Sequence, residues 1–285
     1  MSPKSVRNVT LKVHNSAQTR DTLHNISQLK KIIECALIST YIKSEKPLSL
    51  LIVAKPESGK TTVMRLYIRN KGIVYLTDCT AYGIQRDLLP KLVSREVRTI
   101  IIADLLTPLS KAFKTKQAFI AFLNNLIEEG VAKITTYAMT WDKEVKANVI
   151  TAVTDQAIED GRHEWAKLGF LSRFIIFSYS YSMSTVVEIL SSYSRHGLID
   201  QPIDFQLPTE EVDIDLPSNI ADKLDSIAMK IGEQFQLHGI RAKINLRSLI
   251  KALAYRNGRK IVTEREYSEL VELADYMNFN YNPLR

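Results

Sequence analysis

The stretch LLIVAKPESGKTTVMRL, residues 51–67, places a short loop between an apolar run and an amphipathic segment. The loop closes on Gly59-Lys60-Thr61, the ending of a phosphate-binding loop, but Ala54 stands where that pattern has its first glycine. A short continuous apolar run is typical of a strand buried on both faces of a parallel sheet. The stretch therefore predicts a strand, a phosphate loop and a helix, a unit that belongs to α/β folds.

The pattern of short buried strands recurs along the chain. Further strands are predicted at GIVYLTDC, VRTIIIAD, NVITAVTD and RFIIFSYS, and helices at TLHNISQLKKIIECALISTYIKSE, TTVMRLYIRN and KQAFIAFLNNLIEEG. AKITTYAMTWDKEVKA, residues 132–147, predicts a hairpin or an extended insertion because it is rich in Thr, Tyr and Trp. Strands that alternate with helices predict a mostly parallel sheet that is sandwiched by helices.

The chain changes character after about residue 185. Helical segments are predicted at STVVEILSSYSRHG, SNIADKLDSIAMKIGEQFQLHG, NLRSLIKALAYRNG and TEREYSELVELADYMN, with Ser218 and Thr263 as N-caps. We therefore expect three parts: a basic N-terminal tail over 1–21, an α/β nucleotide-binding core over 22–184, and a linker with a small all-helical domain over 185–285.

The loop residues have a chemical task in this interpretation. Successive backbone N–H groups would wrap the phosphates of ATP, helped by the helix N-terminus. Lys60 would reach the β- and γ-phosphates, and the Thr61 hydroxyl would bind Mg²⁺. The candidate binding residues are Pro56, Glu57, Ser58, Gly59, Lys60, Thr61 and Thr62. The alternative is a structural turn that only caps a helix.

Asp104 follows four apolar residues and ends a predicted strand. Ligands of an open α/β sheet bind at the carboxyl ends of its strands, so Asp104 is expected to hold Mg²⁺ beside Thr61. Its alternative role is a helix cap. Many ATPases place a glutamate directly after this aspartate to polarise the attacking water, but this chain has Leu105. ATP hydrolysis is therefore expected to be weakened or to use another base.

Composition sets the class of protein. Hydrophobic residues make up 45% and charged residues 24%, which excludes a disordered chain, and no apolar run approaches the ~20 residues of a membrane span. Two cysteines without metal-ligand spacing exclude a disulfide framework and fit a cytoplasmic setting. The net charge of +7 would suit contact with nucleic acid, although many soluble proteins carry as much.

The order of these motifs resembles that of an AAA+ ATPase, in the branch that carries a hairpin before sensor 1 and includes the MCM-type helicases. The likeness covers about residues 22–275 and includes IEEGVAKITTYAMTWDKEVKANVITAVTD, LGFLSRF and NLRSLIKALAYRNGRKIVTEREY. It implies a helical lid, with Thr154 as sensor 1, Arg173 as an arginine finger and Arg247 as sensor 2. Thr154 could instead end a strand and Arg173 could form a surface ion pair.

An arginine finger reaches into a neighbour's site, so the resemblance implies a homo-oligomer, either a hexameric ring or a filament. It also implies that the hairpin faces a central channel. Basic residues among aromatic ones suit phosphate contact and base stacking, and a packed hairpin with a wet face is the alternative. The nucleic-acid candidates are Lys133, Tyr137, Trp141, Lys143 and Lys146.

Three functions fit the sequence. The first is an ATP-hydrolysing motor that acts in an oligomer on DNA or on a protein–DNA assembly. It would be a module of the kind carried by mobile elements, with a partner protein that supplies the target. The second is an ATP-gated oligomeric scaffold with little or no hydrolysis, which Ala54 and Leu105 favour. The third is a small-molecule kinase, which would act as a monomer on a metabolite.

Overall fold

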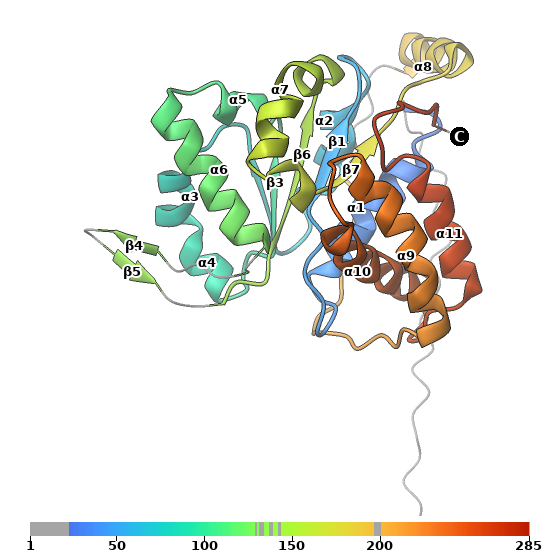
Figure 1. The fold of residues 1–285 in the computed structure, drawn as a ribbon. Helices are drawn as coiled ribbons and strands as arrows, with labels where there is room; N and C mark the ends of the chain where they lie inside the picture. Colours follow the sequence, from blue (N-terminus) through green and yellow to red (C-terminus); the bar gives the residue numbers. More distant parts are fainter. Residues whose placement is uncertain are drawn as a thin grey trace, which may run out of the picture.

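A computed structural model describes residues 23–284, apart from 129, 131–133, 137–138, 142–143 and 197–200. Within this part of the chain a five-stranded parallel sheet has the order β2-β3-β6-β1-β7. Its strands are β1 (Leu50–Val53), β2 (Ile73–Leu76), β3 (Thr99–Ile102), β6 (Asn148–Val153) and β7 (Ile175–Ser178). The predicted α/β class with a parallel sheet is confirmed (Figure 1).

Helices cover both faces of the sheet (Figure 1). The helices of the described residues are α1 (Ser27–Ser39), α2 (Lys60–Arg65), α3 (Ala81–Asp87), α4 (Leu89–Val93), α5 (Leu106–Leu109), α6 (Phe113–Glu128), α7 (Asp155–Lys167), α8 (Met183–His196), α9 (Ser218–Glu233), α10 (Ile240–Arg256) and α11 (Glu264–Ala274). Because side chains alternate along a strand, β1 serves two cores. Leu50 and Ile52 pack with α1 and α2, whereas Leu51 and Val53 pack with α3, α4, α6 and α7.

The C-terminal helices do not form a core of their own. Buried residues of α9, α10 and α11 belong to the same hydrophobic cluster as α1 and one face of the sheet. Leu249 and Leu253 of α10, for example, are fully buried in this cluster. The expected boundary near residue 184 therefore does not separate two hydrophobic cores, because α10 packs against α1 and both helices share one hydrophobic cluster.

Smaller expectations have mixed outcomes. The insertion forms an antiparallel hairpin, β4 (Ile134–Thr136) with β5 (Met139–Trp141), as predicted. Thr263 caps α11 through a capping box with Glu266, also as predicted. The N-cap prediction for Ser218 is wrong, because α9 begins at Ser218 and its N-cap position is Pro217.

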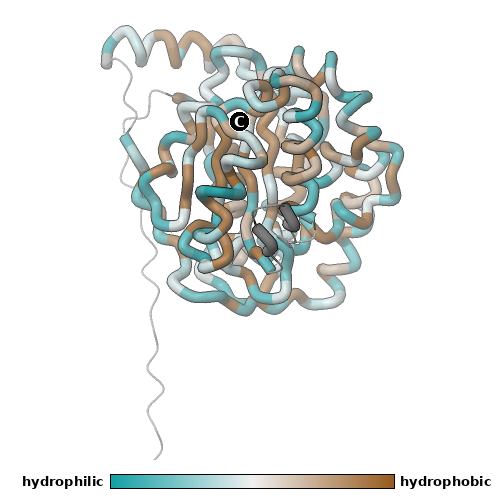
Figure 2. Tube along the Cα trace, turned by 90° about the vertical axis from the view of Figure 1, so that its left-hand side faces the viewer, coloured by the Kyte–Doolittle hydropathy of each residue, from teal (hydrophilic) through white to brown (hydrophobic). Residues whose placement is uncertain are grey.

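The edge of the sheet at β7 is covered by a later segment of the same chain. The backbone N–H of Ser178 donates to the Tyr276 carbonyl at 2.8 Å, and that of Ser180 donates to the Asn282 carbonyl at 3.1 Å. The N–H of Leu284 donates back to Ser180 at 3.1 Å. Beyond this edge α8 projects from the body of the molecule (Figure 2).

Candidate functional site

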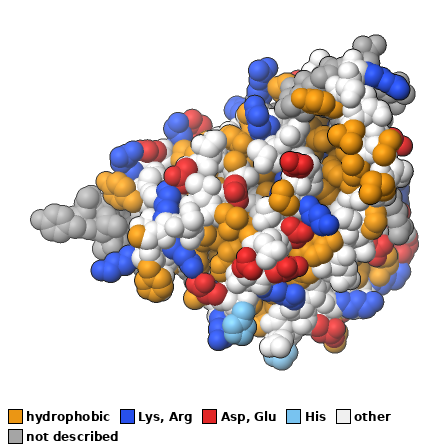
Figure 3. All heavy atoms as spheres, turned by 90° about the horizontal axis from the view of Figure 1, so that it is seen from above, with side chains coloured by type: hydrophobic (Ala, Val, Ile, Leu, Met, Phe, Trp, Pro, Cys, Tyr) orange, Lys and Arg blue, Asp and Glu red, His pale blue; other side chains and the backbone are white. Residues whose placement is uncertain are grey.

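The order of the strands defines where a ligand can bind. From β1, which lies inside the sheet, the chain passes to β2 at one edge. It then crosses the sheet in the opposite direction, through β3 and β6, and reaches β7 at the other edge. The connections therefore leave β1 and β6 toward opposite faces, and ligands of open α/β sheets bind in the crevice at such a switch point. Residues 54–60 follow β1, Asp104 follows β3, and Thr154 and Asp155 follow β6. Figure 3 views this side of the molecule, where acidic and basic side chains lie among hydrophobic ones.

The loop after β1 has a compact geometry without a glycine at its start. Ala54 is fully buried and is not among the residues with positive φ, so its Cβ is accommodated and a glycine is not required there. The left-handed positions are Glu57, with φ of 61°, and Gly59, with φ of 78°. Gly59 is the N-cap of α2, which begins at Lys60.

Lys60 points back into its own loop. Its Nζ donates to the Ala54 and Lys55 carbonyls, both at 2.6 Å, and to the Ser58 hydroxyl at 3.3 Å. Burial lowers the pKa of Lys60 to about 8, and the negative charges of Asp155 and then Asp104 act in the opposite direction. The ammonium group therefore lies inside the loop, and the charges of two carboxylates favour its protonated form.

Two tyrosines support this loop from the strand next to it. The Tyr179 and Tyr181 hydroxyls donate to the same backbone carbonyl of Ser58, at 2.8 and 2.9 Å. Burial raises the pKa of Tyr181 to about 12 and that of Tyr179 further, so both hydroxyls keep their protons. Our sequence reasoning missed both residues. Their i, i+2 spacing past the end of β7 was the available signal, because it puts them on one face of the chain.

The aspartate after β3 and its neighbour lie in different environments. Asp104 is exposed, and its Oδ1 accepts the backbone N–H of Leu106, the first residue of α5, at 3.0 Å, while the N-cap position of this helix is Leu105. Leu105 is fully buried in the core between the sheet and α6. The position where many ATPases carry a glutamate is thus directed into the hydrophobic core, away from the loop.

A magnesium ion would find suitable groups at this edge. Mg²⁺ usually takes one or two carboxylates together with phosphate oxygens and water. The Asp104 carboxylate is exposed, and Thr61, the second residue of α2, is exposed as well. Both residues therefore fit the predicted metal role, which stays a prediction.

The residues after β6 form the start of α7. The Thr154 side chain accepts the backbone N–H of Ala157 at 3.3 Å and so caps this helix. Thr154 follows β6, which pairs with β1, so it lies at the end of the sheet where the ligand is expected. Its role as sensor 1 stays a prediction. Asp155, which we did not single out from the sequence, is the first residue of α7 and the larger acidic influence on Lys60.

The two arginines implied by the resemblance lie away from the loop of their own chain. Arg173 pairs with Glu128, donates to the Gly169 carbonyl and is 15% exposed. Arg247 pairs with Glu45 at 2.9 Å. Glu45 precedes β1, whereas the loop of residues 54–60 follows it, so Arg247 lies toward the opposite end of the sheet from the loop of its own chain, and its role as sensor 2 stays a prediction. A finger role for Arg173 in a neighbour stays a prediction, and it would require the guanidinium to leave Glu128.

The nucleic-acid candidates can be placed only in part. Lys133, Tyr137 and Lys143 lie outside the described residues, and Trp141 is described only as the last backbone position of β5. Lys146 differs from the expectation, because its Nζ donates to the Ile42 carbonyl at 2.6 Å and pairs with Glu211 at 3.3 Å. Burial lowers its pKa, against the opposing charge of Glu211. Lys146 thus anchors the base of the hairpin.

No known protein-family model matches the sequence of this chain, and no curated protein matches it either. In the described part of the chain, none of the helices combines the length and the apolar character that crossing a membrane requires. The interpretation of the site therefore depends on its own geometry.

Proposed function

We propose that this protein is an ATP-binding and ATP-hydrolysing motor of the AAA+ type that works in an oligomer on DNA or on a protein–DNA assembly. The observation that carries the proposal is that Lys60, Asp104 and Asp155 follow β1, β3 and β6 at the switch point of the sheet, where both carboxylates act to raise the pKa of Lys60. A cation held inside a strand–loop–helix turn, with carboxylates on the neighbouring strand ends, is the arrangement that triphosphate chemistry needs.

The residues would act as follows. The backbone N–H groups from Ser58 to Thr62 would surround the phosphates, and the Lys60 ammonium would exchange the Ala54 and Lys55 carbonyls for phosphate oxygens. Asp104 and Thr61 would hold Mg²⁺, which when bound would neutralise charge on the phosphate oxygens. Asp155 is the carboxylate that we assign to orienting water, because Leu105 is buried and apolar.

A second candidate function has its own support. The same burial of Leu105 favours an ATP-gated scaffold that assembles on binding ATP and turns over slowly or not at all. The two candidates make different demands on Asp155: the motor needs it for steady phosphate release, whereas the scaffold does not. The kinase interpretation has no comparable support in the described residues.

Phosphate release measured with malachite green tests the proposal. We expect steady release by the wild type, loss of release in Lys60→Ala, and normal release in the matched control Lys55→Ala, which removes an exposed lysine from the same loop. Asp155→Asn should bind ATP but release phosphate at least tenfold more slowly. ATP binding with at most one phosphate per chain would favour the scaffold. Equal release by wild type and Lys60→Ala would refute both.

Electron microscopy with a non-hydrolysable ATP analogue, with and without DNA, tests the assembly. Closed rings or filaments that form only with the analogue are expected, with DNA density along the hairpins. Monomers under every condition would contradict the oligomeric part of the proposal.

A further inference from the structure

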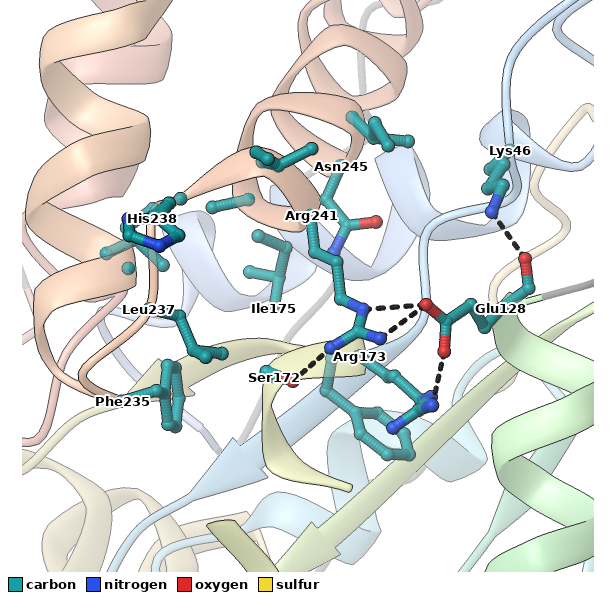
Figure 4. Close-up of a pocket in the computed structure, with 17 residues that line it drawn as sticks. Lys46, Glu128, Ser172, Arg173, Ile175, Phe235, Leu237, His238, Arg241 and Asn245 are labelled. Atoms are coloured by element: carbon teal, nitrogen blue, oxygen red, sulfur yellow. Dashed lines mark hydrogen bonds and ion pairs between the residues drawn. The ribbon is translucent and has the colours of Figure 1, made fainter. Parts of the chain in front are cut away.

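A cavity of about 380 Å³ lies at the end of the sheet opposite to the phosphate loop (Figure 4). Its lining includes Lys46, which precedes β1, Glu128, which precedes β6, and Ile175, the first residue of β7. The other side of the cavity is the turn that joins α9 to α10. Its volume falls in the range of small-ligand pockets, which is about 300–1,000 Å³.

One wall of the cavity is apolar and open to solvent at its mouth. Ile231 and Phe235 line the inner part, and Leu237 and Ile240 line the mouth. Leu237 is 44% exposed and Ile240 is 69% exposed, which is unusual for large aliphatic side chains that adjoin a cavity. A ligand with an apolar body would cover this surface.

Two glycines fix the shape of this wall. A Cβ atom on Gly232 would lie 2.4 Å from the Gly239 nitrogen, and one on Gly239 would lie 2.4 Å from the Ala228 carbonyl oxygen. Gly239 also has a φ of 80°. The turn therefore packs backbone to backbone against α9, so the wall keeps its form without a ligand.

The other end of the cavity is polar and carries excess positive charge. The Glu128 carboxylate accepts a hydrogen bond from Arg241 Nε at 2.8 Å and forms an ion pair with Arg173. The backbone carbonyl of Glu128 accepts a hydrogen bond from Lys46. Two arginines thus share a single carboxylate, and Lys46 adds a third cation beside the backbone of the same residue. Arg241 is 39% exposed, so its guanidinium can be reached from the cavity. Partial burial acts to raise the pKa of Glu128, but the hydrogen bond from Arg241 and the charges of both arginines lower it.

A buried amide points into the same end. Asn245 follows Arg241 by one helical turn, so both side chains share a face of α10. Asn245 is 8% exposed and lines the cavity, and its side chain makes no hydrogen bond with the described residues. Its amide is reached from the cavity, so it can donate an N–H to a group of a ligand bound there.

We propose that this cavity binds a small amphipathic anion, with its apolar body on the α9–α10 wall and its single carboxylate, sulfonate or phosphate group against Arg241 and Asn245. The proposal follows from the surplus of cations, the unpaired amide and the exposed aliphatic mouth. It does not depend on nucleotide binding, because the phosphate loop lies at the opposite end of the sheet.

Fluorescence titration with 8-anilinonaphthalene-1-sulfonate, an amphipathic sulfonate, tests the site in the full-length protein. We expect saturable binding that weakens about tenfold in Arg241→Gln, because hydrogen bonds to charged groups are the strong ones. The matched control Lys243→Gln removes a cation from the same helix, one that pairs with Asp225 and does not line the cavity. It should bind like the wild type. Asn245→Leu should weaken binding about fivefold.

Two further variants keep the test decisive. Ile240→Ser alters an exposed position and should fold normally, as its melting temperature will show, yet weaken binding about threefold. The double variant Val187→Ser, Leu190→Ser removes exposed apolar residues of α8 and should leave binding unchanged.

Competition shows which chemistry the site selects. Decanoate should displace the probe, whereas decyltrimethylammonium, with the same apolar chain and the opposite charge, should not. Equal displacement by both compounds would overturn the proposal. Equal weakening by Arg241→Gln and Lys243→Gln, loss of binding in the α8 variant, or a dissociation constant above about 1 mM would do the same.

Discussion

The two tyrosines that hold the Ser58 carbonyl allow a quantitative prediction. A carbonyl oxygen has two lone pairs, and the Tyr179 and Tyr181 hydroxyls use both. Tyr179→Phe or Tyr181→Phe removes one donor and leaves the other in place. The double variant removes both donors from a residue that is almost fully buried.

The free energy of unfolding should fall unevenly across this set. Each single variant loses one net hydrogen bond, a loss of about 1 kcal/mol, while the carbonyl stays satisfied. The double variant also leaves a buried acceptor unpaired, which adds about 1–3 kcal/mol. We therefore expect about 1 kcal/mol for each single variant and about 3–5 kcal/mol for the double variant. The coupling between the two sites should be at least about 1 kcal/mol.

Urea unfolding at 25 °C measures this cycle, with Tyr82→Phe as the matched control because Tyr82 is exposed. Titration with a fluorescent ATP analogue should show weaker binding only in the double variant, since the peptide after Ser58 is then free to rotate. The reasoning fails if the two losses add within about 0.5 kcal/mol, or if the double variant is no less stable than a single one.

Four further predictions concern Lys60, Leu105 and Glu45. The pKa of Lys60 is lowered to about 8, so near pH 9 ATP should bind with uptake of a proton, and calorimetry in buffers of different ionisation enthalpy should detect it in the wild type but not in Lys60→Arg. The same lowered pKa means that the folded state holds fewer protons at Lys60 between about pH 8 and 10.5. This lysine should therefore make unfolding less favourable as the pH rises through that window, and Lys60→Met should flatten the rise. Leu105→Glu should not raise phosphate release above the wild-type rate and should lower the free energy of unfolding by about 3 kcal/mol or more, measured in urea, because it buries an unpaired carboxylate. Glu45→Gln should destabilise the fold by about 3 kcal/mol because it leaves the Arg247 and Lys251 cations without their shared carboxylate, whereas the exposed control Glu233→Gln should not change the melting temperature.

The fold was largely accessible from the sequence because its strands are short, apolar and separated by helical patterns. Runs such as TIII in β3 and NVITAV in β6 can be recognised without any knowledge of their neighbours. The loop of residues 54–60 was placed correctly between a strand and a helix for the same reason, and its phosphate chemistry stays a prediction. The replacement of glycine by Ala54 proved to be explained by backbone conformation alone.

The sequence did not reveal which segments that are distant along the chain pack against one another. The apolar faces of α9, α10 and α11 predict burial but do not say that α10 packs against α1 and shares one hydrophobic cluster with it. Arg247 illustrates the consequence, because its position on α10 was correct as a helix but its partner, Glu45, is 202 residues away. The cavity beside Arg241 likewise gathers residues from four separate segments, which no local pattern reveals.

The segment that covers β7 limits how copies of this protein can associate. Strands at the margin of a sheet normally offer unpaired backbone groups to other chains, and proteins must block them to avoid aggregation. Here Ser178 and Ser180 already donate to residues near 280 of their own chain. A second molecule therefore cannot add a strand to the sheet beside β7. Any contact between copies at this edge must be made by side chains.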